Sequence, residues 1–525
     1  MNAHTLLVLA QNEMRLRMRR LSTLVAMLAM IALGWAMIGN PVEGTTMISI
    51  EEARVLYTSS ALALGSASLM GPLLILVGFF LLRGRMGEDL RSGMGSVIAA
   101  TPVNSAVFLA GRWLGGVIYL GALAGVFMAA IGVCHVVRGD GPYDLFIYLQ
   151  TYALVLIPTV FFTASCALAF DSIPWFMGKL GDTIYFFIWV FQLSLVAQIQ
   201  GDTTGTLSWP MLLDFSGLAI AAHSLVAHTG ISSFSLGAST FDAALAPIVL
   251  PAQLWSGSLV ASRMGAAAVA LLPVLPALLL FHRFSPDRVK ARLGQQRRTP
   301  LEFANAHLQK LSGLVQPLFS IAARLPGWPG QVVADIALSL VASPVSIVVV
   351  IVAAASSLLA KTASLPGLLI GLVAVWGVLV CDISTRDKTA MTDDMTAALP
   401  GGSAQRYWRH FGAALGLGLL MMGGIALQWL VSAPAQAAAL LIGLVSLSAM
   451  ATCLGAVSKT SRLFMGLFLF GWYVALNVRQ VSWLDAVGFN GAADGRSMFF
   501  YAVLALAASS LGWVVSQRGA GLSRP

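Results

Sequence analysis

The chain has 525 residues, of which 58% are hydrophobic and 10% are charged, and its net charge is +9. A soluble domain carries roughly 25% charged residues, so this composition excludes an ordinary soluble protein and predicts a membrane protein. The four cysteines have no C-x-x-C spacing, which argues against a disulfide framework or a metal site. They are Cys134, Cys166, Cys381 and Cys453.

The first hydrophobic run follows a cluster of four arginines at positions 15, 17, 19 and 20. This order fits both a cleaved signal peptide and a membrane anchor. The run from Leu21 to Ile38 is long for a signal peptide and close to the roughly 20 residues that span a bilayer. No small-x-small cleavage site follows it cleanly, and similar runs recur along the chain. We therefore expect this segment to be retained as the first span.

Residues 1–20 predict an amphipathic helix that lies in the inner membrane interface, as an elbow before the first span. Met14, Met18 and Leu21 fall on one helical face, whereas Arg15 and Arg19 fall on another. The alternative is an ordinary basic flank that only keeps this end of the span inside.

The predicted fold class is an all-α polytopic membrane protein with about 12 transmembrane helices. Glycine and proline inside the spans do not count against them, because both are tolerated in membrane helices. Runs of about 20 residues with few charges occur at 21–39, 58–82, 107–134, 145–170, 180–198, 258–282, 345–361, 365–381, 410–432, 435–457, 463–478 and 498–516.

An even number of crossings places both termini on one side, and the basic residues indicate that this side is the cytoplasm. Of the 31 lysines and arginines, 25 fall in the termini and in the loops on that side. A basic run at 283–298 fits an inner loop facing the anionic leaflet, so no nucleic-acid partner is expected. The six remaining basic residues are Arg54, Arg138, Arg263, Lys361, Arg479 and Arg496.

Three short similarities between the halves of the chain predict an internal repeat. Two of them are FMGKLGDTIY (176–185) with FMGLFLFGWY (464–473), and AATPVNSAVFLAGRWLGG (99–116) with AALPGGSAQRYWRHFGAA (397–414). A weaker one pairs the N-terminal helix with a later segment that carries Asp335 in place of Glu13.

These similarities predict two six-helix units in the same orientation, residues 1–282 and 331–525. A basic cytoplasmic linker, residues 283–330, would join them. The first unit would include the elbow helix and a long periplasmic loop, residues 200–256.

The pattern resembles the membrane subunits of ABC-2 type (type V) ABC transporters, here with two such units fused. The resemblance is carried by the basic elbow, six spans, a helical stretch after the second span, and the entry to the third span, TPVNSAVFLAGRW (101–113). It implies a permease subunit that forms the translocation pathway of an exporter in a bacterial inner (cytoplasmic) membrane. It also implies two copies of a separate ABC ATPase, which would bind ATP and Mg, and no cofactor in this chain.

In such proteins the inner loop after the second span carries the contact with the ATPase. The matching loops are residues 83–102 and 382–400, and both mix acids and bases in a way that suits a polar protein interface. The alternative is a solvated loop that only maintains topology. The residues assigned to docking are Glu88, Asp89, Arg91, Arg386, Asp387, Asp393 and Asp394.

The second half departs from the family pattern because its first helix lacks the arginine cluster. The outer loop 200–256 is also far longer than its counterpart, 479–497. Its apolar stretch at 212–230 suits a re-entrant or interfacial helix, and the loop is a candidate contact for a periplasmic partner. His223 and His228 lie five residues apart, which is not the i,i+4 spacing that puts two ligands on one helical face, so no metal is expected.

The chain has no G-x-x-x-x-G-K-[ST] motif, and its nearest approach, Gly178-Lys179, lacks the first glycine and the hydroxyl residue. We therefore expect no enzymatic activity and no catalytic residues in this chain.

The alternative function is an ion-gradient-driven secondary transporter. All 22 acidic residues fall in loops or at span ends, which weakens a proton relay but leaves sodium binding by backbone carbonyls open. The motifs of a membrane-embedded hydrolase are not present in the sequence.

Polar and aromatic residues inside the spans are candidates for the lining of a central pathway. Tyrosine and tryptophan also gather in interfacial belts, which is the alternative. Because no charged residue is predicted in mid-membrane, a hydrophobic or amphipathic cargo is easier to accommodate than a strongly charged one. The candidates are Tyr185, Trp189, Gln192, Tyr473 and Asn477.

Overall fold

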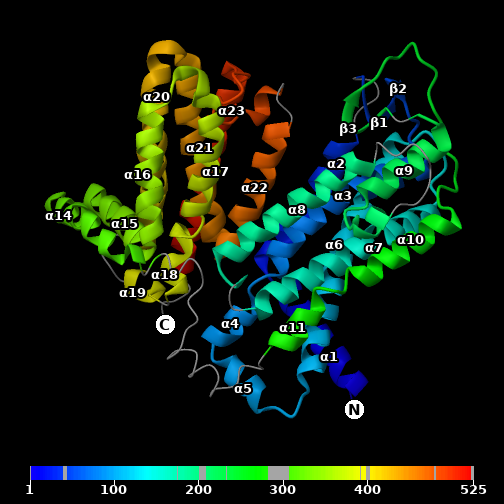
Figure 1. Ribbon diagram of the computed structural model, residues 1–525, viewed down its shortest axis with the longest axis horizontal. Coiled ribbons are helices and arrows are strands. Elements are labelled where there is room, and N and C mark those ends of the chain that lie inside the picture. Colours follow the sequence, from blue (N-terminus) through cyan, green and yellow to red (C-terminus); the bar gives the residue numbers. More distant parts are fainter. Residues whose placement is uncertain are drawn as a thin grey trace. The chain divides into compact units, whose positions relative to one another are not determined.

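The chain forms two compact units, residues 1–296 and 297–525, each built from long apolar helices (Figure 1). Their boundary falls inside the predicted linker, and residues from Leu308 onward are helical and pack within unit 2. The computed structural model describes residues 2–38, 44–173, 176–199, 209–231, 233–281, 305, 307–390, 392–397, 402–477 and 481–521.

Three long helices form the core of unit 1: α3 (Ser59–Leu82), α6 (Ser105–Arg138) and α7 (Leu145–Ser172). The residue before each helix is Thr, Asn or Asp, and its side chain accepts a hydrogen bond from an N–H group of the first turn. α3 packs on both other helices, and 83% of its apolar stretch is buried. Because α3 is central, lipid contacts the neighbouring helices rather than α3.

The first helix, α1 (Asn2–Met18), packs along α6, and α2 (Leu21–Met37) follows after a short break. Gly111 and Gly115 of α6 allow the two backbones to approach closely, as small residues four apart do in membrane helices. A Cβ atom at Gly115 would lie only 2.8 Å from the Cβ atom of Glu13.

The face of α1 that packs on the bundle carries charged side chains. Ala10, Glu13 and Arg17 are buried, whereas Met18 is exposed. Arg17 pairs with Glu13 at 2.9 Å and donates a hydrogen bond to the carbonyl of Leu82 at 3.3 Å. Glu13 also lies 3.7 Å from Arg85 of α4, so charged groups of α1 face the bundle while Met18 stays exposed.

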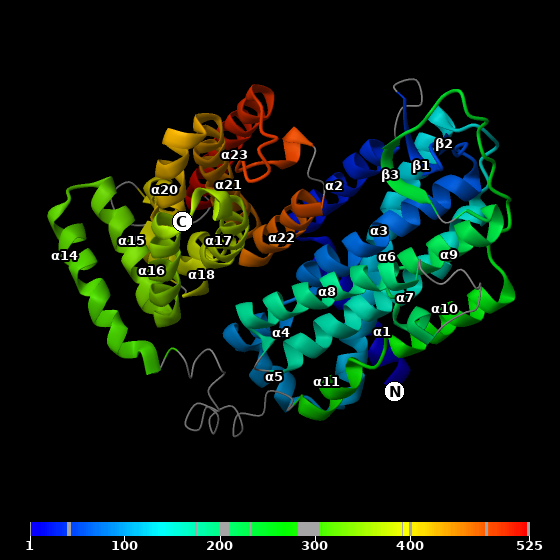
Figure 2. The same ribbon diagram turned by 45° about the horizontal axis from the view of Figure 1, so that its top comes forward.

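The remaining helices of unit 1 surround this core. In both Figure 1 and Figure 2, α4 and α5 lie at the opposite end of unit 1 from the strands. These helices are α4 (Arg85–Arg91), α5 (Met94–Ala100), α8 (Lys179–Ile199), the 3-10 helix η3 (Trp209–Leu213), α9 (Leu218–Thr229), α10 (Gly257–Val269) and α11 (Val274–Leu280).

A small antiparallel sheet that the all-α prediction did not include lies in unit 1. Its order is β2-β1-β3, with β1 (Thr45–Ile50), β2 (Ala53–Arg54) and β3 (Phe234–Thr240). β1 pairs with β3, so the segment before α3 is tied to the long loop. That loop, predicted at 200–256, also contains α9, where the apolar stretch predicts a helix.

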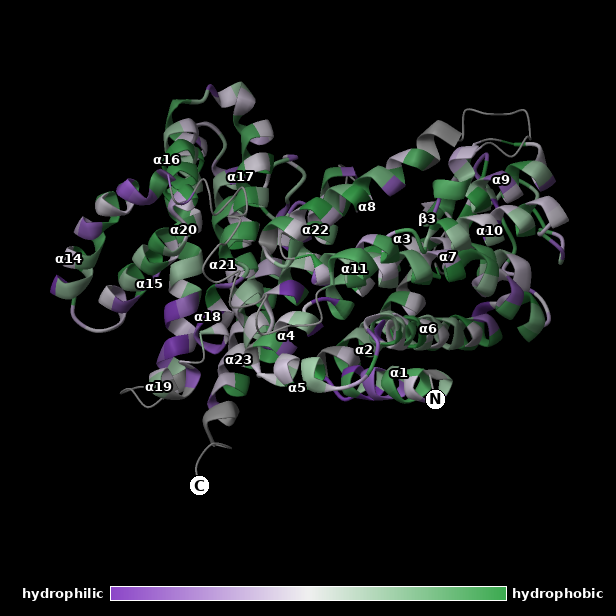
Figure 3. Ribbon diagram, turned by 60° about the horizontal axis from the view of Figure 1, so that its bottom comes forward, coloured by the Kyte–Doolittle hydropathy of each residue, from purple (hydrophilic) through white to green (hydrophobic). Residues whose placement is uncertain are grey.

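The regular secondary structure in the described part of unit 2 consists of helices. α15 and α16 meet at a bend of 114°, because Pro344 begins α16 and disfavours the helical conformation at Ser343. Hydrophilic residues gather near α18, whereas the middle parts of α16 and α17 are hydrophobic (Figure 3). The elements are η4 (Leu308–Val315), α14 (Gln316–Arg324), α15 (Trp328–Ala342), α16 (Pro344–Leu359), η5 (Thr362–Ser364), α17 (Leu365–Val380), η6 (Ile383–Thr385), α18 (Arg386–Thr389), α19 (Asp393–Ala397), α20 (Gly402–Ser432), α21 (Pro434–Ser458), α22 (Ser461–Asn477), η7 (Ser482–Leu484) and α23 (Gly495–Gly521).

Eight helices of the described chain are long and apolar enough to cross a membrane, or nine if the bent pair α15 and α16 is one span. The chain is therefore a mostly helical, multi-pass membrane protein. Every predicted span overlaps a helix, but the spans at α2, α8, α16 and α22 are not among the eight. The count of twelve crossings stays a prediction.

Candidate functional site

The charged cluster of unit 1 is built around the turn between α3 and α4. α3 ends at Leu82, and Gly84 turns the chain with a φ of +90°, a conformation that favours glycine. Asp171, at the end of α7, accepts hydrogen bonds from the backbone N–H groups of Gly84 (2.8 Å) and Arg85 (3.0 Å). This carboxylate fixes the direction in which α4 leaves the bundle.

Arg83 lies at the centre of this turn, and its side chain is fully buried. Its Nε donates to Asp182 at 2.9 Å, and its Nη1 lies 3.5 Å from Asp171. The guanidinium carbon also lies 5.2 Å and 5.6 Å from the ring centres of Phe79 and Phe170. Arg83 thereby joins the ends of α3, α7 and α8.

The predicted docking acids of α4 are held in the same cluster. Glu88 is about one-third exposed and accepts hydrogen bonds from Arg20 (2.6 Å) and Arg85 (3.0 Å). Asp89 is buried and pairs with Arg112 of α6. Glu88 therefore stays accessible at the surface, whereas Asp89 fastens α4 to α6.

Next to this cluster, α4 and α5 present apolar side chains at the surface. Leu90, Met94 and Val97 are 40%, 50% and 57% exposed, and we call these three residues the α4–α5 surface. Apolar side chains beside exposed charges are typical of a protein contact.

Unit 2 holds its inner loop in a similar way. Asp335 of α15 pairs with Arg409 of α20 at 2.6 Å, and Asp387 of α18 lies 3.3 Å from the same arginine. Arg386 donates a hydrogen bond to the Ser339 hydroxyl of α15 at 2.7 Å. Charged side chains thus join α15, α18 and α20.

The clusters of the two units use corresponding positions of the chain. Asp89 pairs with Arg112, and Asp387 lies 3.8 Å from His410; each pair is separated by 23 residues (112 − 89 and 410 − 387). Glu13 of α1 and Asp335 of α15, which the sequence aligns, also join these clusters. The repeat of the two halves stays a prediction.

The last predicted docking residues lie on α19. The Asp393 side chain is 47% exposed and pairs with Arg406, and Met395 is 73% exposed. The side chains of Arg91 and Asp394, also predicted to dock, lie outside the described residues. α19 thus offers an exposed acid and an exposed apolar group together.

The predicted pathway residues have varied surroundings. Tyr185 and Trp189 are buried and donate hydrogen bonds to backbone carbonyls of α3 at 2.9 Å and 2.8 Å, which holds α8 against α3. In unit 2, the exposed Asn477 donates to the carbonyl of Tyr473 at 2.8 Å. Their role in a pathway stays a prediction.

A non-helical turn, Asp214–Gly217, inserts between the helices of unit 1. The N–H group of Phe215 donates to Gln192, the third pathway residue of this unit, at 3.1 Å, and Thr159 of α7 donates to the Phe215 carbonyl at 2.6 Å. A Cβ atom at Gly71, near the middle of α3, would lie 1.9 Å from the carbonyl oxygen of Ser216 in this turn. Irregular backbone at membrane depth requires such partners.

The sequence reasoning assigned no role to Arg263 of α10. It is buried and donates hydrogen bonds to the carbonyls of Asp214 (2.6 Å), Val155 (2.8 Å) and Leu154 (3.0 Å). Pro158 has no N–H group, so the Leu154 carbonyl lacks its helical donor, and the guanidinium replaces it. An arginine inside a predicted span was a signal for such a role.

The described residues contain no group of three or more His, Cys, Asp or Glu side chains that could hold a metal ion. Comparison of the chain with protein-family models, with curated proteins and with solved structures found no match.

Proposed function

We propose that the chain is the membrane-spanning permease subunit of an ATP-driven ABC exporter of a bacterial inner membrane. In this proposal two fused six-helix units in parallel orientation, with both termini in the cytoplasm, form the translocation pathway. Two copies of a separate ATPase dock to it. The observation that carries the proposal is that each unit fastens a short helical segment to two longer helices through charged side chains, α4 to α1 and α6 in unit 1, and α18 to α15 and α20 in unit 2.

The charged clusters suit the transmission of movement from a docked ATPase to the membrane helices. α4 is bonded to α7 through Asp171 and to α6 through Asp89, while Arg83 ties the same turn to α8. Buried, charge-assisted contacts of this kind are strong and directional. A displacement of α4 would therefore move several helices of unit 1 together.

Site-specific photo-cross-linking in native membranes tests where the ATPase docks. We expect a photoreactive residue at Val97 or Met395 to cross-link to a P-loop ATPase chain. The control is Trp209 of the long loop, whose exposure of 73% equals that of Met395 and exceeds the 57% of Val97. No cross-link at Val97 and Met395, or an equal yield at Trp209, would contradict the docking proposal.

One buried acid bears on the alternative function, an ion-gradient-driven transporter. Asp214, which the sequence places in an outer loop, is fully buried beside the middle of α3 and α7. Its carboxylate accepts hydrogen bonds from Ser216 (2.6 Å), Gly217 (3.0 Å) and Ile220 (3.2 Å), so it caps the start of α9. These bonds favour a structural role over a proton relay.

A further inference from the structure

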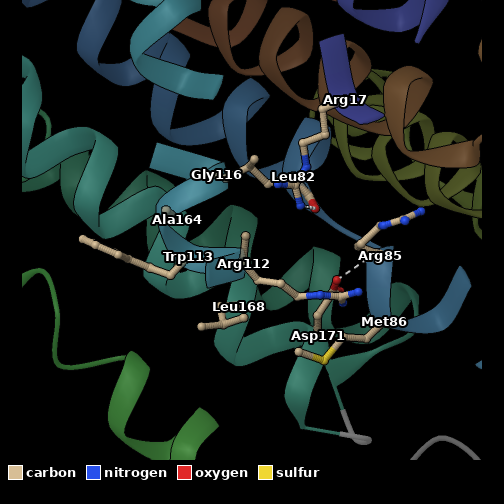
Figure 4. A pocket seen from close by; sticks show the side chains of 11 residues that line it. Arg17, Leu82, Arg85, Met86, Arg112, Trp113, Gly116, Ala164, Leu168 and Asp171 are labelled. Atoms are coloured by element: carbon tan, nitrogen blue, oxygen red, sulfur yellow. Dashed lines mark hydrogen bonds between the residues drawn. The ribbon is translucent and has the colours of Figure 1, made fainter. Parts of the chain in front are cut away.

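The geometry points to a binding site for an oxyanion of the phosphate class in the charged cluster of unit 1. The pocket lies between α1, the turn from α3 to α4, α6 and α7 (Figure 4), and has an empty volume of about 320 Å³ that includes its open mouth. This site is independent of the proposed function, because its occupant would bind without an ATPase.

Two buried arginines supply the donors of this site. Arg17 and Arg112 are only 7% and 8% exposed and reach the pocket from α1 and α6 (Figure 4). Nη2 of Arg17 faces Glu13 and Leu82, and Nη2 of Arg112 faces Asp89. Nη1 of Arg17 and both Nε and Nη1 of Arg112 have no hydrogen-bond partner among the described residues.

Buried, unpaired donors of a charged group are costly, so they call for a ligand. Three arginines line the pocket, Arg17, Arg85 and Arg112, and each already pairs with a carboxylate, that of Glu13, Glu88 and Asp89 respectively. The Asp171 oxygens accept the N–H groups of the α3–α4 turn. An added anion would therefore be held by the guanidinium N–H groups that have no partner, and the planar fork of arginine matches a phosphate better than a point charge does.

Burial lowers the pKa of Arg17, and the nearby Glu13 carboxylate opposes this effect. Arginine is always protonated in proteins, so the donors at the pocket are cationic at every working pH.

The wall of the pocket indicates where such an anion comes from. Trp113, Gly116, Ala164 and Leu168 line the side formed by α6 and α7, which gives an apolar surface next to the arginines. In a membrane protein this combination suits a lipid phosphodiester, whose acyl chains would follow the helices. Free phosphate offers the same oxygen chemistry and is the other source.

Binding to the full-length, detergent-purified protein tests this inference. The probes are inorganic phosphate, dioctanoyl phosphatidylglycerol and dioctanoylglycerol, which has the same tails without phosphate. We expect at least one phosphate-bearing probe to bind and raise the unfolding temperature, and dioctanoylglycerol to have no effect. Binding of the phospholipid alone identifies a lipid site, and binding of inorganic phosphate identifies a site for the free ion.

Charge-preserving variants show whether these arginines are the donors. Arg112→Lys and Arg17→Lys keep a positive charge opposite Asp89 and Glu13 but remove the guanidinium N–H groups that have no partner, so each should weaken binding at least tenfold. Arg15→Lys, at an exposed position of α1, is the matched control and should bind normally. If one pocket variant does not fold, the other carries the test. The inference is overturned if no phosphate-bearing probe binds, or if both pocket variants bind like the control.

Discussion

At the scale of single residues, the structure depends on buried arginines that join distant parts of the chain. Arg17 contacts a residue 65 positions away, and Arg263 contacts residues more than 100 positions away. The sequence shows that these arginines exist but not which carbonyls and carboxylates they meet, because those partners come together only on folding. Arg83, Arg112 and Arg263 therefore could not be assigned from the sequence, although Glu88 and Asp89 could be placed on the right loop.

Removing the Arg263 guanidinium should strongly destabilise unit 1. Arg263→Met would leave the Asp214 carboxylate without its cation and three buried carbonyls without a donor, at a cost of roughly 3–5 kcal/mol. The thermal unfolding of the purified protein, followed by size-exclusion chromatography, measures this loss. Arg496→Met, at an exposed position, serves as the control, and equal stability of the two variants would argue against the proposed role of Arg263.

At the scale of elements, the apolar runs were predictable because twenty apolar residues in sequence leave few alternatives to a membrane helix. The rotation of α1 was not predictable, since Glu13 and Arg17 turn its charged face toward the bundle. The sheet was missed for a similar reason. β1 and β3 are separated by most of unit 1, and neither is long enough to be recognised without its partner.

The close packing of α1 on α6 gives a prediction with a control on the same helix. Gly115→Ala would place a Cβ atom 2.9 Å from the carbonyl oxygen of Ala10, and such overpacking costs about 1–3 kcal/mol. At Gly125 a Cβ atom meets nothing within 4 Å, so Gly125→Ala should be neutral or slightly stabilising. Unfolding temperatures that fall equally for both variants would show that the close packing of α1 on α6 does not depend on Gly115.

The α4–α5 surface should tolerate a charge in the isolated protein but not in the complex. Val97→Asp changes an exposed side chain, so we expect unchanged thermal stability. Co-purification of the ATPase should fall about tenfold, because a carboxylate would be buried at the contact without a partner. Trp209→Asp in the long loop is the control. If Val97→Asp retains the ATPase as fully as the control does, the α4–α5 surface is not the contact.

At the scale of the whole molecule, the sequence predicts a multi-pass helical protein, and the described helices confirm that class. The number of crossings is harder to predict, because α2, α8 and α22 are short or only partly apolar and α15 and α16 share a bend. The proposed repeat stays a prediction, although acids occupy corresponding positions in the two units, Asp89 beside Arg112 and Asp387 beside His410.

The proposed topology predicts that both termini lie in the cytoplasm. Green fluorescent protein fused to either end should therefore fluoresce, and alkaline phosphatase fused to either end should be inactive. The two reporters give opposite signals, so poor expression of one fusion cannot imitate the result. An active phosphatase at the C-terminus alone would mean an odd number of crossings and would exclude the arrangement of two parallel six-helix units.

Purification of the tagged full-length protein from its native membrane, with identification of bound chains and an ATP hydrolysis assay, tests the central claim most directly. The account predicts a P-loop ATPase at two copies per chain, with hydrolysis that co-elutes with the complex. A folded, monodisperse protein that elutes without an ATPase chain and without hydrolysis would contradict it, and ion-gradient-driven transport would then take its place.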